Sequence, residues 1–157
     1  MVYRKVIIVM RKYFFVGIGG SSGALLRYII KDLHVLPLPA VFPWGTFLVN
    51  IAGAFILGFV MSAVSDTSNA GGNLKLVLTV GLAGALTTFS AFCQDIVCLL
   101  QSGHILISSS YLLISVIFGS AAVIAGEFIG GYISSGKTEN EQIRLENSLS
   151  ENERDVI

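Results

Sequence analysis

Four long apolar stretches restrict what this chain can fold into. A helix needs about 20 mostly apolar residues to cross a bilayer, and four segments meet this requirement: residues 14–30, 46–64, 74–100 and 105–133. Only 13% of the 157 residues are charged, against roughly 25% in an ordinary soluble domain. We therefore expect an all-α integral membrane protein with four transmembrane helices, located as a multi-pass protein in the cell membrane.

Polar residues collect at the two ends of the chain. Residues 1–12 are interpreted as a basic N-terminal leader, with Met10 as an alternative start to Met1. Residues 13–133 are expected to form the membrane domain. Residues 134–157 form a polar tail that is expected to be disordered or to lie as a short helix on the surface.

The Lys and Arg residues near the four spans give only a weak orientation bias. With four spans, one side of the membrane carries Arg11, Lys12, Lys75 and Lys137, and the other carries Lys31 with Arg27 close by. Because the excess of bases on one side sets orientation, such a chain is expected to insert either way. Pairs of small residues at helical spacing also favour close helix packing and oligomerisation.

Two spans carry polar residues along one helix face. The second span has Thr46, Asn50 and Gly53 on one face, and the fourth has a stripe of small and hydroxyl residues: Ser108, Tyr111, Ser115, Gly119 and Ala122. Polar groups inside a membrane usually face a partner or a cavity. Helix packing and an aqueous path are both open readings of these stripes.

The charged residues favour an anion over a cation and give no catalytic site. Arg27, near the end of the first span, either extends to the interface or supplies positive potential at a vestibule. The paired carboxylates or the Ser/His/Asp arrangement of an enzyme within the membrane are not found, so an enzyme is not expected. Amides, hydroxyls and the positive edges of aromatic rings suit an anion, whereas a cation path would show acidic side chains.

The stretch GLAGALTTFSAF, residues 81–92, lies in the middle of the third apolar segment. Its glycines and hydroxyl residues are compatible with a break of the helix in mid-membrane, which is tolerated where protein buries it or water lines it. They are equally compatible with a continuous helix whose Thr and Ser side chains bond to carbonyls one turn earlier.

Three motifs, in order, resemble the Fluc-type (CrcB-like) fluoride channel family. They are GGSSGALLRY at residues 19–28, GTFLVNIAGAFILG at 45–58 and GLAGALTTFSAF at 81–92. With the four spans, the resemblance covers roughly residues 13–133. It implies an antiparallel, dual-topology homodimer with two pores and a broken third helix. It also implies a structural, non-transported Na⁺ at the dimer centre, held by the backbone carbonyls of Gly84 and Thr87.

The resemblance also implies a set of pore residues. Phe89 and Phe92 match the pair whose ring edges face fluoride, and Asn50 matches the asparagine that donates a hydrogen bond in the pore. The remaining candidates are hydroxyl residues of the third and fourth spans: Thr88, Ser90, Tyr111 and Ser115. Arg27 matches the family's arginine in the first motif, which suits a vestibule role.

Three positions depart from the family pattern. Ala91 stands where a threonine is frequent, Asp95 where a glutamate is common, and Gly119 where a further hydroxyl is expected. These departures concern the details of the polar track along the fourth span.

The expected function is passive, fluoride-selective export of cytoplasmic fluoride, which reduces its toxicity. One alternative is a small four-span, dual-topology proton-coupled drug antiporter, which needs a membrane-embedded carboxylate that residues 14–30 do not contain. The other is a noncatalytic membrane assembly protein, for which the polar stripes serve packing alone.

Overall fold

The computed structural model describes residues 2–32, 41–64 and 69–154 of the chain, most of which are helical. The elements are α1 (Val2–Asp32), α2 (Trp44–Ala63), α3 (Asn69–Leu76), the π-helical segment η1 (Val77–Ala83), α4 (Gly84–Leu86), α5 (Phe89–Gln101) and α6 (Ile105–Arg154).

Within the part of the chain that the structure describes, four helical stretches are long and apolar enough to cross a membrane, as the sequence predicts. They are Val9–Ile30, Trp44–Ala63, Gly72–Gln101 and Ile105–Gly136. At a rise of 1.5 Å per residue, even the shortest of them spans about 30 Å, which is the thickness of the hydrocarbon core. The prediction of an all-helical, four-span membrane protein is therefore confirmed.

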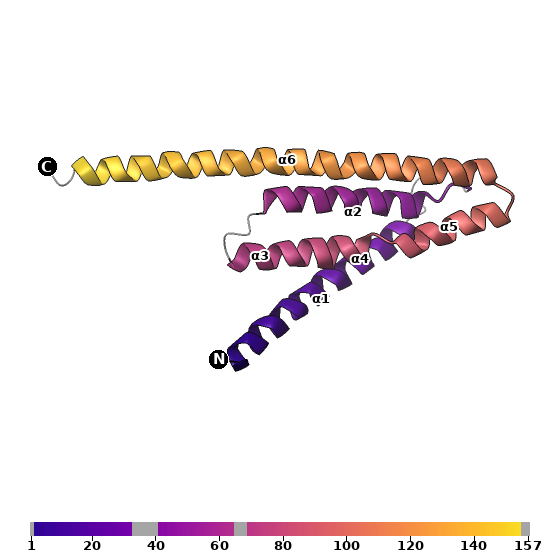
Figure 1. The fold of residues 1–157 in the computed structure, drawn as a ribbon, viewed down its shortest axis with the longest axis horizontal. Helices are drawn as coiled ribbons and strands as arrows, with labels where there is room; N and C mark the ends of the chain where they lie inside the picture. The colour runs from indigo at the N-terminus through magenta and orange to yellow at the C-terminus, as the bar shows by residue number, and fades with distance from the viewer. Residues whose placement is uncertain (1, 33–40, 65–68, 155–157) are drawn as a thin grey trace.

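The helices pack as two pairs, because glycines let their backbones approach closely. In Figure 1, α2 lies along α6, whereas α1 crosses the third span obliquely and its N-terminal half runs away from the other helices. A Cβ atom at Gly126 of α6 would overlap the carbonyl oxygen of Phe55 in α2. Gly23 of α1 is equally close to the carbonyl of Leu82. Small residues at such crossings are typical of membrane helices.

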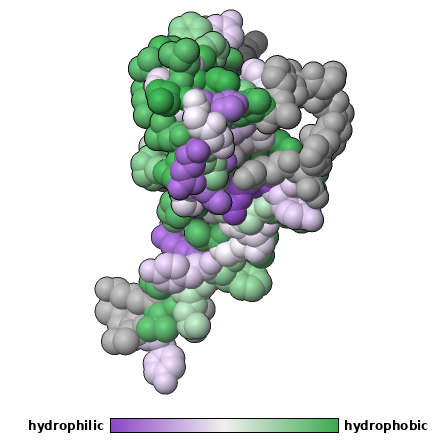
Figure 2. Space-filling model, turned by 90° about the vertical axis from the view of Figure 1, so that its right-hand side faces the viewer, coloured by the Kyte–Doolittle hydropathy of each residue, from purple (hydrophilic) through white to green (hydrophobic). Residues whose placement is uncertain are grey.

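The outer surface of the helices is apolar, as a lipid environment requires. Large hydrophobic side chains are exposed along the spans, for example Phe128 (78%) and Ile117 (62%). Figure 2 views the molecule from the end at which α5 turns into α6, and much of the upper part of this face is hydrophobic, with hydrophilic residues gathered nearer its middle.

The third span is not one regular helix. The apolar span starts at Gly72, close to the predicted Leu74, within helix α3, which itself begins at Asn69. The chain then passes through the wide turns of η1 and reaches the short helix α4. The helix then stops, and α5 begins at Phe89. π-Helical turns are rare and often occur at functional sites, and here they directly precede the interruption.

Both ends of the chain extend the helices of the membrane domain. α1 starts at Val2, so the boundary drawn at residue 12 does not coincide with a helix end. α6 continues through the polar tail to Arg154 and is far longer than a short surface helix. Residues 137–154 contain no Gly or Pro and are rich in good helix formers. The division into leader, channel domain and tail stays a prediction. The sequence PLPAVFPWG, residues 37–45 between the first two spans, contains three prolines that should break a helix, and it falls partly on residues 33–40, outside the described residues.

Candidate functional site

The break in the third span consists of two extended residues. Thr87 has φ −75° and ψ 151°, and Thr88 has φ −149° and ψ 111°. The hydroxyl of Thr88 then caps α5, because its Oγ1 accepts a hydrogen bond from the backbone N–H of Ala91 (3.2 Å). A threonine at this position satisfies one of the free N–H groups at a helix start. GLAGALTTFSAF thus contains a helix end followed by a capped helix start.

Asn50, on the neighbouring helix α2, forms hydrogen bonds with the backbone of the break. Its Oδ1 accepts a hydrogen bond from the backbone N–H of Thr88 (2.8 Å), and its Nδ2 makes a longer contact with the Thr88 carbonyl oxygen (3.5 Å). One amide side chain therefore occupies both polar backbone groups of Thr88. This ties the break to α2.

These bonds redirect the two donors that would pair with the carbonyls of Gly84 and Thr87 in a continuous helix. Such a helix would join Thr88 N–H to the Gly84 oxygen and Ala91 N–H to the Thr87 oxygen. Here the first donates to Asn50 and the second to the Thr88 hydroxyl. The two carbonyls are thereby released from these bonds and can serve as ligands for a hard cation, which prefers oxygen.

A pocket of about 330 Å³ lies beside the break. Its lining comes from α2, the break, α5 and α6, and consists of Asn50, Thr87, Thr88, Phe89, Phe92, Ser115 and Val116. It therefore brings together residues from distant parts of the chain that were proposed as pore residues. The lining contains amide and hydroxyl groups and aromatic rings, and no carboxylate.

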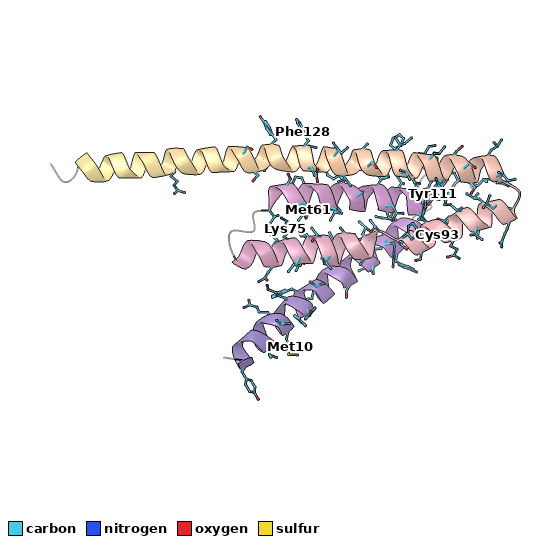
Figure 3. All side chains as sticks on the ribbon, in the orientation of Figure 1. Met10, Met61, Lys75, Cys93, Tyr111 and Phe128 are labelled. Atoms are coloured by element: carbon cyan, nitrogen blue, oxygen red, sulfur yellow. The ribbon has the colours of Figure 1, made fainter. Side chains whose placement is uncertain are left out.

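Two buried hydroxyl groups on α6 have no hydrogen-bond partner among the described residues. They belong to Ser115, which lines the pocket, and to Tyr111, whose side chain is 0% exposed. In Figure 3, Tyr111 lies on the side of α6 that faces the other helices, whereas Phe128 points outward. A buried donor left unpaired costs about 1–3 kcal/mol, so the Ser115 hydroxyl favours an acceptor bound in the pocket, whereas the Tyr111 hydroxyl lies near the Asp95 carboxylate.

The two phenylalanines differ in their surroundings. Their ring centroids are 6.1 Å apart at an interplanar angle of 33°. Phe92 packs inward against Tyr111, with centroids 5.1 Å apart. Phe89 is 78% exposed and extends from the surface of the single chain. One ring is thus fixed within the chain, and the other presents an apolar face to its surroundings.

The remaining candidates lie at varying distances from the pocket. Ser90 is joined to it through a hydrogen bond between its hydroxyl and that of Thr88 (3.1 Å). Arg27 is half-buried on α1 and is not among the residues that line this pocket. Within the described ranges, no group of three or more His, Cys, Asp or Glu side chains could hold a metal ion. The roles of all these residues stay predictions.

The pocket also includes residues that sequence reasoning did not assign to it. Thr87 was proposed only for its carbonyl, and Val116 was not proposed, yet both residues line the pocket. The second role of Asn50, as a hydrogen-bond acceptor for the break, has no local sequence signal because the partners are 38 residues apart.

Comparison with known proteins places these features in a family. The family model described as "CrcB-like protein, Camphor Resistance (CrcB)" matches residues 14–127. A protein of Clostridium acetobutylicum named fluoride-specific ion channel FluC 2 is 42% identical over 117 residues, which cover 74% of this chain and 96% of the relative. A fluoride-specific ion channel FluC of Bacteroides fragilis is 39% identical over 124 residues, 77% of this chain and 97% of the relative. A fluoride-specific ion channel FluC of Allorhizobium ampelinum is 36% identical over 124 residues, which cover 79% of this chain and 99% of the relative. The chain belongs to the CrcB-like family of membrane proteins.

Proposed function

We propose that this protein is a passive, fluoride-selective ion channel of the cell membrane that lets cytoplasmic fluoride leave the cell and so reduces its toxicity. The observation that carries the proposal is the pocket at the break, which joins an amide, hydroxyls and two phenylalanines without a carboxylate. The relatives named as fluoride-specific ion channels support the same function. Neither name describes an enzyme, a drug antiporter or an assembly protein.

The chemistry of this pocket suits a small, strongly hydrated anion. A selective path must replace the water around the ion with converging donors. The hydroxyls of Ser115 and Thr88 and one N–H of Asn50 can donate, and ring edges carry partial positive charge. Chloride is larger and is expected to fit poorly in a passage narrowed by Phe89 and Phe92.

The working unit proposed here is an antiparallel homodimer with two pores. The exposed ring of Phe89 supports it, since 78% exposure leaves this side of the pore incomplete in one chain. Gly84 is also exposed, so its backbone is accessible to a second copy. The weak bias of the Lys and Arg residues is compatible with insertion in both orientations.

A structural Na⁺ at the dimer centre belongs to the same proposal. The carbonyls of Gly84 and Thr87 would hold it, two from each chain. The redirected N–H groups of Thr88 and Ala91 support this assignment, because they release both oxygens from helical hydrogen bonds. The ion would offset the repulsion among four converging carbonyl dipoles, and we propose that the break lies in mid-membrane between the two copies. Arg27 would contribute positive potential at a vestibule.

The pore assignment is tested by replacing each phenylalanine. Phe89→Ile and Phe92→Ile remove the ring edges while keeping apolar bulk, so both are expected to abolish fluoride flux through liposomes while the dimer persists. Phe128→Ile is the matched control, since Phe128 has the same 78% exposure but lies on the outer face of α6, and it should conduct as the wild type does. Wild-type flux in both pore variants would refute the assignment.

A further inference from the structure

Four aromatic rings form a continuous row from the break to the start of α2. Phe89 contacts Phe92 at 6.1 Å between centroids, Phe92 contacts Tyr111 at 5.1 Å, and Tyr111 contacts Phe42 at 5.3 Å. The last pair is edge-to-face, with an interplanar angle of 87°. The row therefore continues past the pocket residues to Phe42, which comes from the segment that precedes α2 and has no role assigned so far.

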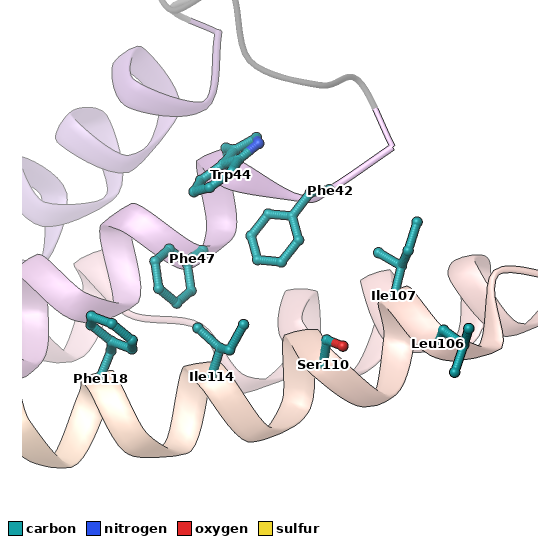
Figure 4. A pocket seen from close by; sticks show the side chains of 8 residues that line it. All are labelled: Phe42, Trp44, Phe47, Leu106, Ile107, Ser110, Ile114 and Phe118. Atoms are coloured by element: carbon teal, nitrogen blue, oxygen red, sulfur yellow. The ribbon is translucent and has the colours of Figure 1, made fainter.

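Phe42 is itself held in place by α2. Its ring lies 4.4 Å from that of Trp44 and 5.7 Å from that of Phe47, between centroids. The following residue, Pro43, restricts the backbone of Phe42. Figure 4 shows these rings facing α6 across an apolar cleft of about 590 Å³, with Ser110 and Ile114 on the opposite wall. The position of Phe42 is thus fixed independently of Tyr111.

Tyr111, by contrast, depends on its ring neighbours. Its side chain is fully buried and its hydroxyl has no hydrogen-bond partner among the described residues. Two ring contacts, with Phe92 and with Phe42, flank this aromatic side chain, and the carboxylate of Asp95 lies near its hydroxyl. We expect removal of either ring to open space beside Tyr111 and so to shift its hydroxyl.

We propose that Phe42 is a positioning residue for fluoride passage, which acts by fixing the orientation of Tyr111. The inference rests on the proposed channel function and adds to it a residue outside the three sequence motifs. Phe42 does not line the pocket at the break, so its effect must pass through Tyr111. Phe47 provides the contrast, because it packs on Phe42, Trp44 and Phe118.

The test is a double-mutant cycle on fluoride efflux from liposomes. Phe42→Leu and Phe47→Leu are each measured in the wild type and in Tyr111→Phe, with the thermal stability of every dimer recorded. One edge-to-face ring contact corresponds to a change of about threefold to tenfold. We therefore expect Phe42→Leu to slow efflux by about that factor in the wild type, and by less than about twofold in Tyr111→Phe. Phe47→Leu should change efflux by the same factor in both backgrounds.

Ring-keeping and ring-removing variants complete the test. Phe42→Tyr should conduct as the wild type does, and Phe42→Met, which fills the space without a ring, should behave as Phe42→Leu. An equal effect of Phe42→Leu in both backgrounds would overturn the proposal, as would full flux in Phe42→Met. If wild-type protein releases no fluoride at all, the channel function itself fails, and this inference fails with it.

Discussion

Asn50 is the single residue that connects the most parts of the proposed site. Its Oδ1 accepts the N–H of Thr88, which keeps the break attached to α2, and the same amide lines the pocket. An asparagine can do both because its two ends differ, one being an acceptor and the other a double donor. Asn50 can therefore both donate a hydrogen bond in the pore, as the family motif implies, and accept the hydrogen bond from Thr88 that the structure shows.

Two substitutions of Asn50 separate these roles. Asn50→Asp keeps the acceptor for Thr88 N–H but replaces the donor with negative charge, so the dimer should stay folded while fluoride flux is lost. Asn50→Leu leaves the Thr88 N–H without its partner and should lower the free energy of unfolding by about 1–3 kcal/mol as well as stop flux. Thermal unfolding and liposome efflux check both. If the Asn50→Leu dimer is as stable as the wild-type dimer, the hydrogen bond between Asn50 and Thr88 does not stabilise the break.

At the scale of the elements, close contact between α2 and α6 keeps the two halves of the pocket together. Gly126 and Gly130 of α6 lie against the carbonyls of Phe55 and Phe59 in α2, leaving no room for a Cβ atom. Gly119 of the same helix has open space around it. The glycines of α6 therefore have different structural roles, although the sequence does not distinguish them.

Gly126→Ala should separate α2 from α6 and destabilise the protein by about 1–3 kcal/mol, which is typical of overpacking. Gly119→Ala is the control on the same helix and should leave stability unchanged or slightly raised, since alanine favours helix. Chemical or thermal unfolding of the two variants in the same detergent measures the difference. Equal stability of the two variants would contradict the observed packing.

The elements also show how far the sequence predicts the fold. Hydropathy locates the four spans because their length and composition are strong signals; the second is expected at 46–64 and found at Trp44–Ala63. Hydropathy does not predict the π-helix η1, because no particular amino-acid composition distinguishes a π-helix from an α-helix. For GLAGALTTFSAF, composition left a break and a continuous helix equally open. In the structure the break is accompanied by a hydrogen bond from Thr88 to Asn50, which lies 38 residues away in sequence.

The candidate site is predictable to a similar extent. Motif resemblance names Asn50, Thr88, Phe89, Phe92 and Ser115, and the structure brings these five to one pocket. It does not identify Phe42, whose contact with Tyr111 joins residues far apart in the sequence. Side chains that act through a neighbour leave no spacing pattern in the sequence.

For the whole molecule, the proposed Na⁺ links dimerisation to the break. An ion that binds only the assembled dimer stabilises it by mass action. Replacing Na⁺ with N-methylglucamine throughout purification should therefore lower the unfolding temperature of the dimer and reduce fluoride flux. Size-exclusion chromatography and thermal unfolding with and without Na⁺ check this. Identical stability and flux with and without Na⁺ would refute the proposal that Na⁺ stabilises the dimer.

The assembled protein is proposed to conduct fluoride selectively and passively. The most direct test is efflux from liposomes that contain purified wild-type protein, recorded with fluoride and chloride electrodes in parallel, with valinomycin and a potassium gradient to carry the compensating charge. We expect fast fluoride release that requires valinomycin, while chloride is retained. Retention of fluoride by liposomes with verified, folded dimers, or equal release of both anions, would contradict it.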